Sequence, residues 1–337
     1  MFKTFVIYKL PEDFNLDPNL HSEMFEKLKA KPLTGAIKTK YGWAELLQSN
    51  KPYIKLENDY IFRIEKRFRS VASSTLDEAV RQKMIQLAQD SPRTWGVNAK
   101  VSSQDVKNLR EMCENLLIPK SLTRFKDIIV WFNTELKFLF IGSSGNKEVE
   151  AIIDLFKLTF KTFPASPLTV NNDVSSVFTS WLSSLELPPT LAIKNGDIAF
   201  ENRANGANKV RYSNQDIESD EINANLLAQK RPLQLSCEWN ATLGFTVNNE
   251  LKFSKIKQLG LLKEKIKTAN KEMEINNPAQ EMEAKRVKDM TSYTLTRLSI
   301  LNLIKEILPS LNSSTGFAGG AQSNTSELIE GFVESID

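Results

Sequence analysis

The chain has 337 residues, of which 41% are hydrophobic and 25% charged, and its formal net charge is +3. This composition is typical of a soluble globular protein with two or three sub-domains, and no apolar run approaches the roughly 18 residues that a membrane span needs. The single histidine, His21, argues against catalytic sites that depend on histidine and excludes a histidine-rich metal site.

The first part of the chain is predicted to form strands with one helix between them. Residues that favour β-structure precede Pro11, so we expect a strand over residues 2–10. A helix is expected from about Ser22, with His21 exposed at its start. Residues 60–68 alternate between apolar and charged side chains, which favours a second strand.

In the following segment the spacing of apolar residues changes from that of a strand to that of a helix. Apolar residues in 75–89 recur every three or four positions, which predicts an amphipathic helix, and residues 103–117 repeat this pattern after a break that begins at Pro92. These two helices are inserted between strands and are expected to project as a helical hairpin. A hairpin of two apolar strands over residues 127–141 and a helix over residues 147–160 follow.

The second half repeats strands and helices in the same style. Helices are expected at residues 219–229 and 259–311, the latter broken near Pro278. The strands are expected near Ile198 and Val210 and at residues 233–239, 243–247 and 251–256. The pattern as a whole predicts an α+β fold with antiparallel sheets and packed helices.

No motif for a phosphate loop, dinucleotide or metal stands out, so we expect no cofactor, no metal and no enzymatic activity. Cys113 and Cys237 are far apart and are expected to be buried thiols in a reducing cytoplasm. The acidic residues are numerous but no pair is distinctive. A hydrolase that uses carboxylates alone therefore stays open as an alternative.

Several landmarks resemble RdgC, the recombination-associated protein family. They keep their order and approximate spacing from the first residues to about Leu259. The landmarks are residues 2–10, Tyr41-Gly42-Trp43, the run from Leu116 to Phe125 that contains Pro119-Lys120-Ser121-Leu122, Trp131 in its hairpin, residues 211–217, residues 219–222 and residues 235–239.

This resemblance implies a horseshoe-shaped subunit with a helical tip, and a ring-shaped homodimer whose hole passes duplex DNA. It implies sequence-independent DNA binding that restrains RecA-dependent recombination, in the cytoplasm and at the nucleoid. The implied domains are a central domain (residues 1–74 and 125–165), a helical tip (75–124) and a base or gate domain (166–311). The tail (312–337) has no counterpart in the family pattern, and its composition, rich in serine, glycine and asparagine, predicts a disordered acidic tail.

The resemblance also implies where two subunits meet. The tip contact falls on Leu122, which stands where the family pattern has an aromatic residue. The gate contact falls on Asn214 and Gln215, where Asn214 replaces a lysine. Both departures keep part of the contact that the family pattern would make. They affect how tightly the ring is expected to close.

Basic residues are the candidates for contacts with DNA phosphates, which need no base-reading element. Lys107 and Arg110 are three positions apart and share a helix face. Arg124 has an alternative role in an ion pair with Asp127 or Glu135, and the lysines between residues 252 and 267 fit a solvated amphipathic face equally well. A dimerisation module without DNA affinity is the other open alternative. The candidates are Lys100, Lys107, Arg110, Lys120, Arg124, Lys126, Lys209 and Arg211.

Overall fold

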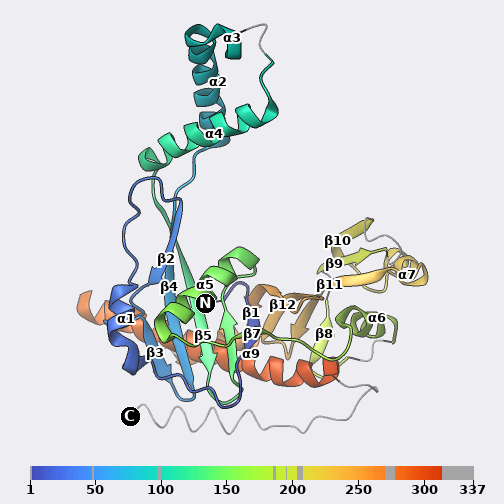
Figure 1. Cartoon of the computed structure of the whole chain (residues 1–337). Helices are drawn as coiled ribbons and strands as arrows, with labels where there is room; N and C mark the ends of the chain where they lie inside the picture. The colour runs from blue at the N-terminus through green and yellow to red at the C-terminus, as the bar shows by residue number, and fades with distance from the viewer. Residues whose placement is uncertain are drawn as a thin grey trace. The chain divides into compact units, whose positions relative to one another are not determined.

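The computed structural model describes residues 2–47, 49–96, 100–184, 187–194, 196–202, 208–269 and 278–312 (Figure 1). The chain divides into two compact units, Met1–Pro167 and Leu168–Asp337, and each contains an antiparallel sheet with helices. The expected α+β class with antiparallel sheets is therefore confirmed. Within the described ranges, no helix combines the length and hydrophobicity that crossing a membrane requires.

The sheet of the first unit has the strand order β2-β4-β5-β6-β1-β7, and β3 pairs with β4. The helices α1 (Ser22–Lys27) and α5 (Asn146–Phe160) accompany it, and the short helix η1 (Pro18–His21) precedes α1. The strands are β1 (Val6–Lys9), β2 (Thr39–Trp43), β3 (Tyr53–Leu56), β4 (Asp59–Phe68), β5 (Arg124–Asn133), β6 (Phe138–Ile141) and β7 (Ser166–Pro167).

Both faces of this sheet are apolar. On one face, Phe62 contacts Trp43 and the ring of Phe156 from α5, and the Trp43 indole donates a hydrogen bond of 2.8 Å to Thr159. On the other face, the ring of Trp131 stacks on Phe140 with centroids 4.1 Å apart. Burial on both faces explains why the apolar–charged alternation of residues 60–68 is interrupted at a buried isoleucine.

One strand boundary and the burial of one residue in this unit differ from the sequence prediction. Strand β5 begins at Arg124, not at residue 127, because its pairing with β4 continues to the pair Phe68–Arg124. His21 is half-buried, and its ring contacts Phe160 with centroids 4.9 Å apart. The spacing of apolar residues along the sequence does not reveal which strands pair or which tertiary contacts form.

The helical insertion lies between β4 and β5 and comprises α2 (Ser73–Asp90), α3 (Pro92–Trp95), α4 (Ser103–Leu117) and η2 (Ile118–Lys120). Pro92 begins a short helix, as proline at a first helical position allows. Ser102 caps α4 in a reciprocal capping box with Asp105. The insertion has its own small core of Leu76, Val80, Leu109 and Cys113. Leu116, near the end of α4, lies outside this core and is 62% exposed.

The sheet of the second unit has the order β10-β9-β11-β12-β13, and β8 pairs with β11. The strands are β8 (Leu191–Ile193), β9 (Gly196–Glu201), β10 (Lys209–Gln215), β11 (Arg231–Trp239), β12 (Leu243–Asn248) and β13 (Phe253–Gln258). The helices are α6 (Val174–Ser184), α7 (Asp220–Leu227), α8 (Gly260–Ala269) and α9 (Pro278–Asn312). The predicted acidic tail lies outside the described residues after Asn312.

The two faces of this second sheet differ in character. Buried residues such as Phe200, Leu235 and Trp239 occupy one face, whereas alternate positions such as Ser236 and Thr246 are polar. The prediction that Cys113 and Cys237 are buried thiols is confirmed, and burial raises the pKa of Cys237 to about 12. Helix α6 was not predicted, because its run of serine and β-branched residues has a weak helical propensity.

Candidate nucleic-acid interface

The candidate cations fall on four elements and one connection. Lys107 and Arg110 lie on α4, Lys120 ends η2, and Arg124 and Lys126 lie on β5. Lys209 and Arg211 lie on the edge strand β10, and Lys100 precedes α4. Some of these cations form ion pairs with carboxylates of the chain, and others do not.

Lys120 and Arg124 are exposed at the junction between the helical insertion and the first sheet. Pro119 lies within the single turn of η2, so the chain leaves α4 and enters β5 within a few residues. Among the residues that the structure describes, neither cation has a carboxylate partner. Between them, Leu122 is 87% exposed and therefore contributes nothing to the core of this chain. The junction thus presents uncompensated positive charge beside an apolar side chain.

Lys126 belongs to a compact ionic cluster with Glu148, Lys66 and Ser143. The Glu148 carboxylate, on the first turn of α5, accepts hydrogen bonds of 2.6 Å from Lys126, 2.8 Å from Lys66 and 2.5 Å from Ser143. Burial alone would raise the pKa of Glu148, but these three donors lower that pKa to about 2. The cluster joins β4 and β5 to α5, so part of the positive charge predicted for DNA is neutralised inside the fold.

Arg110 and Lys107 differ in the same way on α4. Arg110 lies 2.5 Å from Asp77 of α2, whereas Lys107 is exposed and has no ion pair within the described ranges. The Arg110–Asp77 pair is about half exposed on both sides, so solvent screens it strongly. Lys107 is therefore the freer cation of the two. Lys100 is likewise exposed and unpaired in the described part of the chain.

Strand β10 presents the cations expected in the second unit. Lys209 approaches Glu201 of β9 to 3.8 Å, while Arg211 is exposed and, among described residues, unpaired. Asn214 is exposed at a β-bulge with φ of 55°, but the Gln215 amide donates to Ser219 at 3.0 Å and Glu221 at 3.3 Å. The side chain of Gln215 is thus partly occupied within the chain.

Sequence reasoning overlooked an aromatic–cation pair beside Arg124. The Phe125 ring is 61% exposed, and the Arg67 guanidinium lies 5.3 Å from its centroid. The register of β4 and β5 places these two residues directly opposite each other. Asp127, considered as a partner of Arg124, instead accepts two hydrogen bonds from Arg63, at 3.0 and 3.1 Å. Pairing between distant strands creates both contacts, so no local sequence signal reveals them.

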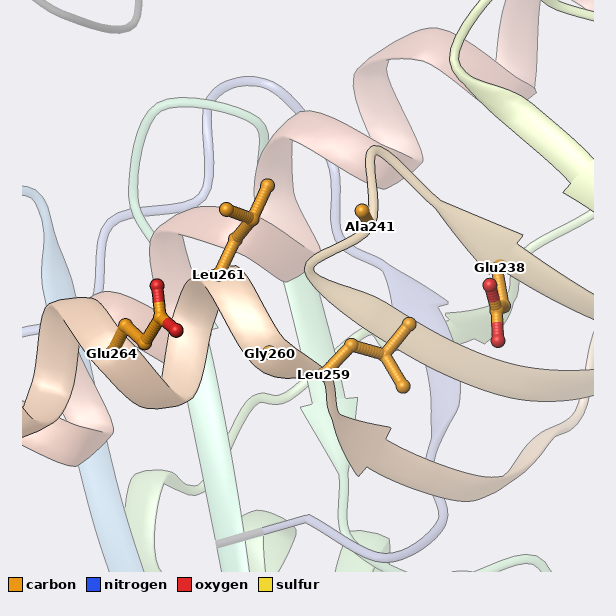
Figure 2. A pocket seen from close by; sticks show the side chains of 6 residues that line it. All are labelled: Glu238, Ala241, Leu259, Gly260, Leu261 and Glu264. Carbon is orange, nitrogen blue, oxygen red and sulfur yellow. The ribbon is translucent and has the colours of Figure 1, made fainter.

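A shallow hollow of about 360 Å³ lies in the second unit near the start of α8 (Figure 2). Glu238 and Glu264 line it together with apolar residues, and no basic residue does. Two carboxylates disfavour a phosphate, so this hollow does not fit the candidate interface. Within the described ranges, no group of three histidine, cysteine or acidic residues is arranged to hold a metal ion.

Comparison with known proteins agrees with the resemblance noted in the sequence. The family model described as "Putative exonuclease, RdgC" matches residues 1–305. The chain belongs to the RdgC family. Its relatives include proteins named "Recombination-associated protein RdgC" from Psychromonas ingrahamii, 21% identical over 80% of this chain and 88% of the relative, and from Pasteurella multocida, 22% identical over 90% and 96%.

A third RdgC relative, from Shewanella loihica, is 19% identical over 93% of this chain and 99% of its own length. The match between RdgC proteins and this chain therefore extends through both units. The family description names an exonuclease, whereas the names of these relatives refer to recombination and to no enzyme.

Proposed function

We propose that this protein binds double-stranded DNA without sequence preference. The observation that carries the proposal is the pair Lys120 and Arg124, two exposed cations without carboxylate partners in the described chain, on either side of the exposed Leu122. Cations of this kind contact phosphates, which repeat along any duplex and carry no sequence information. Membership of a family whose relatives are named for recombination supports DNA as the partner.

We further propose that two copies form a ring around the duplex and restrain RecA-dependent recombination at the nucleoid. Leu122, Asn214 and Gln215 are the proposed subunit contacts, and exposure of Leu122 and Asn214 leaves both accessible to a second copy. Sedimentation with and without duplex DNA tests the dimer. A RecA strand-exchange reaction with increasing amounts of the protein tests the restraint, and unchanged exchange would contradict it.

The decisive experiment on binding compares two unrelated duplexes across salt concentration. Because phosphate contacts release counterions, affinity should fall by orders of magnitude between about 50 and 200 mM salt, and equally for both sequences. A strong preference for one duplex would overturn the proposal. We propose binding without cleavage, so the same DNA should remain intact with magnesium, and its shortening from the ends would favour the exonuclease of the family description.

A further inference from the structure

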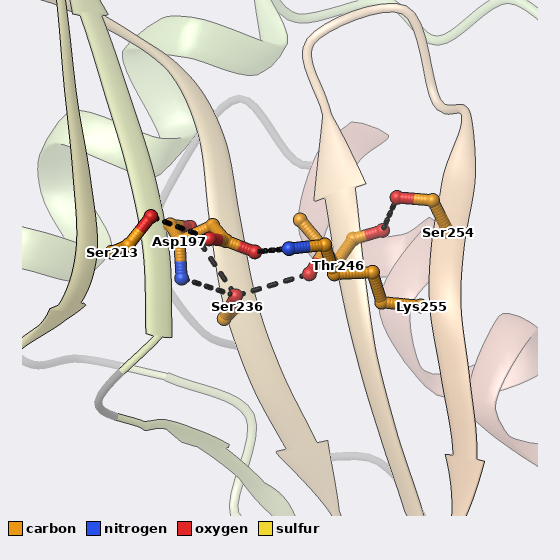
Figure 3. A network of polar contacts seen from close by, with 6 residues as sticks. All are labelled: Asp197, Ser213, Ser236, Thr246, Ser254 and Lys255. Carbon is orange, nitrogen blue, oxygen red and sulfur yellow. Dashed lines mark hydrogen bonds and ion pairs between the residues drawn. The ribbon is translucent and has the colours of Figure 1, made fainter.

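A continuous polar row crosses the second sheet from one strand to the next (Figure 3). Ser213 of β10 donates a hydrogen bond of 3.2 Å to the Asp197 carboxylate on β9. Ser236 of β11 hydrogen-bonds to the backbone of Asp197 and lies 3.0 Å from the hydroxyl of Thr246 on β12. On β13, the Ser254 hydroxyl donates to the Thr246 carbonyl at 3.4 Å.

A β-bulge occurs at each end of this row. The register of β10 against β9 shifts between Tyr212 and Gln215, and Asn214 has φ of 55°. The register of β12 against β13 shifts between Gly244 and Thr246, and Lys255 has φ of 52°. A lysine rarely adopts this left-handed conformation, and bulges commonly redirect a side chain.

The second bulge directs Lys255 across the sheet. Its ammonium forms an ion pair with the Asp197 carboxylate, and Figure 3 shows the side chain extending over Thr246 toward that residue. Lys257 lies opposite Gly244 of β12. Gly244 and Thr246 are two positions apart on that strand and point to the same side, so Lys257 lies on the polar face. It is exposed and forms no ion pair with a carboxylate among the described residues, but its charge, together with the hydrogen bond from Lys255, lowers the pKa of Asp197.

The opposite edge of the same face also carries positive charge. Arg211 lies opposite Ala199 of β9. Ala199 and Asp197 are two positions apart on β9, so Arg211 lies on the same face as Asp197. Lys209 lies opposite Glu201. The same face carries three acidic residues. Asp197 is paired with Lys255, Glu201 lies 3.8 Å from Lys209, and Glu238 lies in the row of Gly244 and Lys257 beside the hollow of Figure 2. Arg211 and Lys257 are the two cations of these edges that form no ion pair within the described residues.

We propose that this polar face is a phosphate-contacting surface for the DNA backbone, and that Asp197 occupies the place of a phosphate oxygen in the free protein. The inference rests on the proposed DNA binding and assigns it a second surface. The Asp197 carboxylate accepts hydrogen bonds from an ammonium and from a hydroxyl. Phosphates accept hydrogen bonds from the same kinds of donor in proteins. Arg211 on β10 and Lys257 on β13 are four strand spacings apart, roughly 19 Å, so they can contact separate phosphates of one duplex.

Neutralising Asp197 tests this competition directly. The variant Asp197→Asn leaves Lys255 without its internal anion, so binding to a random duplex should tighten and the slope of log affinity against log salt should steepen by about one. Adding Lys255→Gln to that variant should return the slope to its original value. Lys257→Gln alone should make the slope shallower, because this exposed lysine forms no ion pair within the described chain and acts on Asp197 only at longer range.

Two matched variants control for overall charge. Asp154→Asn releases Lys157 from an exposed ion pair on α5, and Lys31→Gln removes an exposed charge in the loop after α1. Both should leave the salt slope unchanged, and thermal unfolding should verify that every variant is folded. If Asp197→Asn and Lys257→Gln behave like these controls while the wild-type chain binds DNA, the pair is purely structural and the inference fails. If the wild-type chain binds no DNA, the proposed function itself fails.

Discussion

The ammonium of Lys126 lies 2.6 Å from Oε2 of Glu148, on a carboxylate that is nearly buried at the start of α5. Arg124, two residues earlier on the same strand and therefore on the same face, has no such partner in the described chain. One β-strand thus presents a cation used by the fold and a cation free for a ligand.

This difference predicts opposite effects for two similar substitutions. Lys126→Gln should lower the free energy of unfolding by about 1 kcal/mol, because it removes one donor from a partly buried carboxylate. Arg124→Gln should leave stability nearly unchanged and reduce the salt slope of DNA binding by about one. Chemical denaturation and salt titration measure the two quantities. A loss of stability in Arg124→Gln with an unchanged slope would give Arg124 a structural role.

Acid should weaken the fold through Glu148. Its pKa is about 2 in the folded chain against an ordinary value of 4.5, so its contribution is complete above the ordinary pKa and is lost as pH falls toward 2. The shift corresponds to at most about 3 kcal/mol at neutral pH. Glu148→Gln should therefore be less stable than wild type at pH 7, and the difference should shrink at pH 3. The exposed Glu26→Gln serves as control and should show no such narrowing.

Leu122→Asp should weaken self-association without unfolding the chain. The side chain is 87% exposed, so the substitution leaves the core untouched but would place a charge in the proposed subunit contact. Leu20→Asp is a matched control, because Leu20 is 79% exposed and lies far along the chain from the insertion. Sedimentation at several protein concentrations should shift toward monomer for Leu122→Asp alone. Equal behaviour of the two variants would remove Leu122 from the interface.

Lys107 and Arg110 should contribute unequally to DNA binding although they share a face of α4. Lys107→Gln should reduce the salt slope by about one, whereas Arg110→Gln should reduce it less, because Asp77 already neutralises Arg110. Salt titrations of both variants on one duplex measure the difference. Asp77→Asn should raise the affinity, and a lower affinity would show that the ion pair positions the helix for binding.

Local pattern predicted most of the elements in this chain. The helix expected at residues 147–160 is α5, one residue longer, because its apolar positions recur with a clear helical period. Short strands such as β3 and β8 and the serine-rich α6 carry no such period, and they form because neighbouring strands and the core stabilise them.

The candidate site was less predictable than the fold. The sequence identified the basic residues, but pairing between distant strands decides which of them are neutralised. Lys66 and Lys126 meet Glu148 from separate parts of the chain, and Lys255 meets Asp197 across two intervening strands. Such partners depend on register and on a bulge, which no spacing along the sequence reveals.

The helical insertion leaves and rejoins the first sheet at neighbouring points, because Phe68 of β4 pairs with Arg124 of β5. A segment with fixed, adjacent ends is a closed loop, and doubling its length costs only about 0.6 kcal/mol of closure entropy. Folding of the sheet therefore places little constraint on the length of the insertion, and its landmark residues are held by the proposed contacts with DNA and a second copy, not by the sheet. An artificial chain with a tight turn in place of the insertion should still form the sheet.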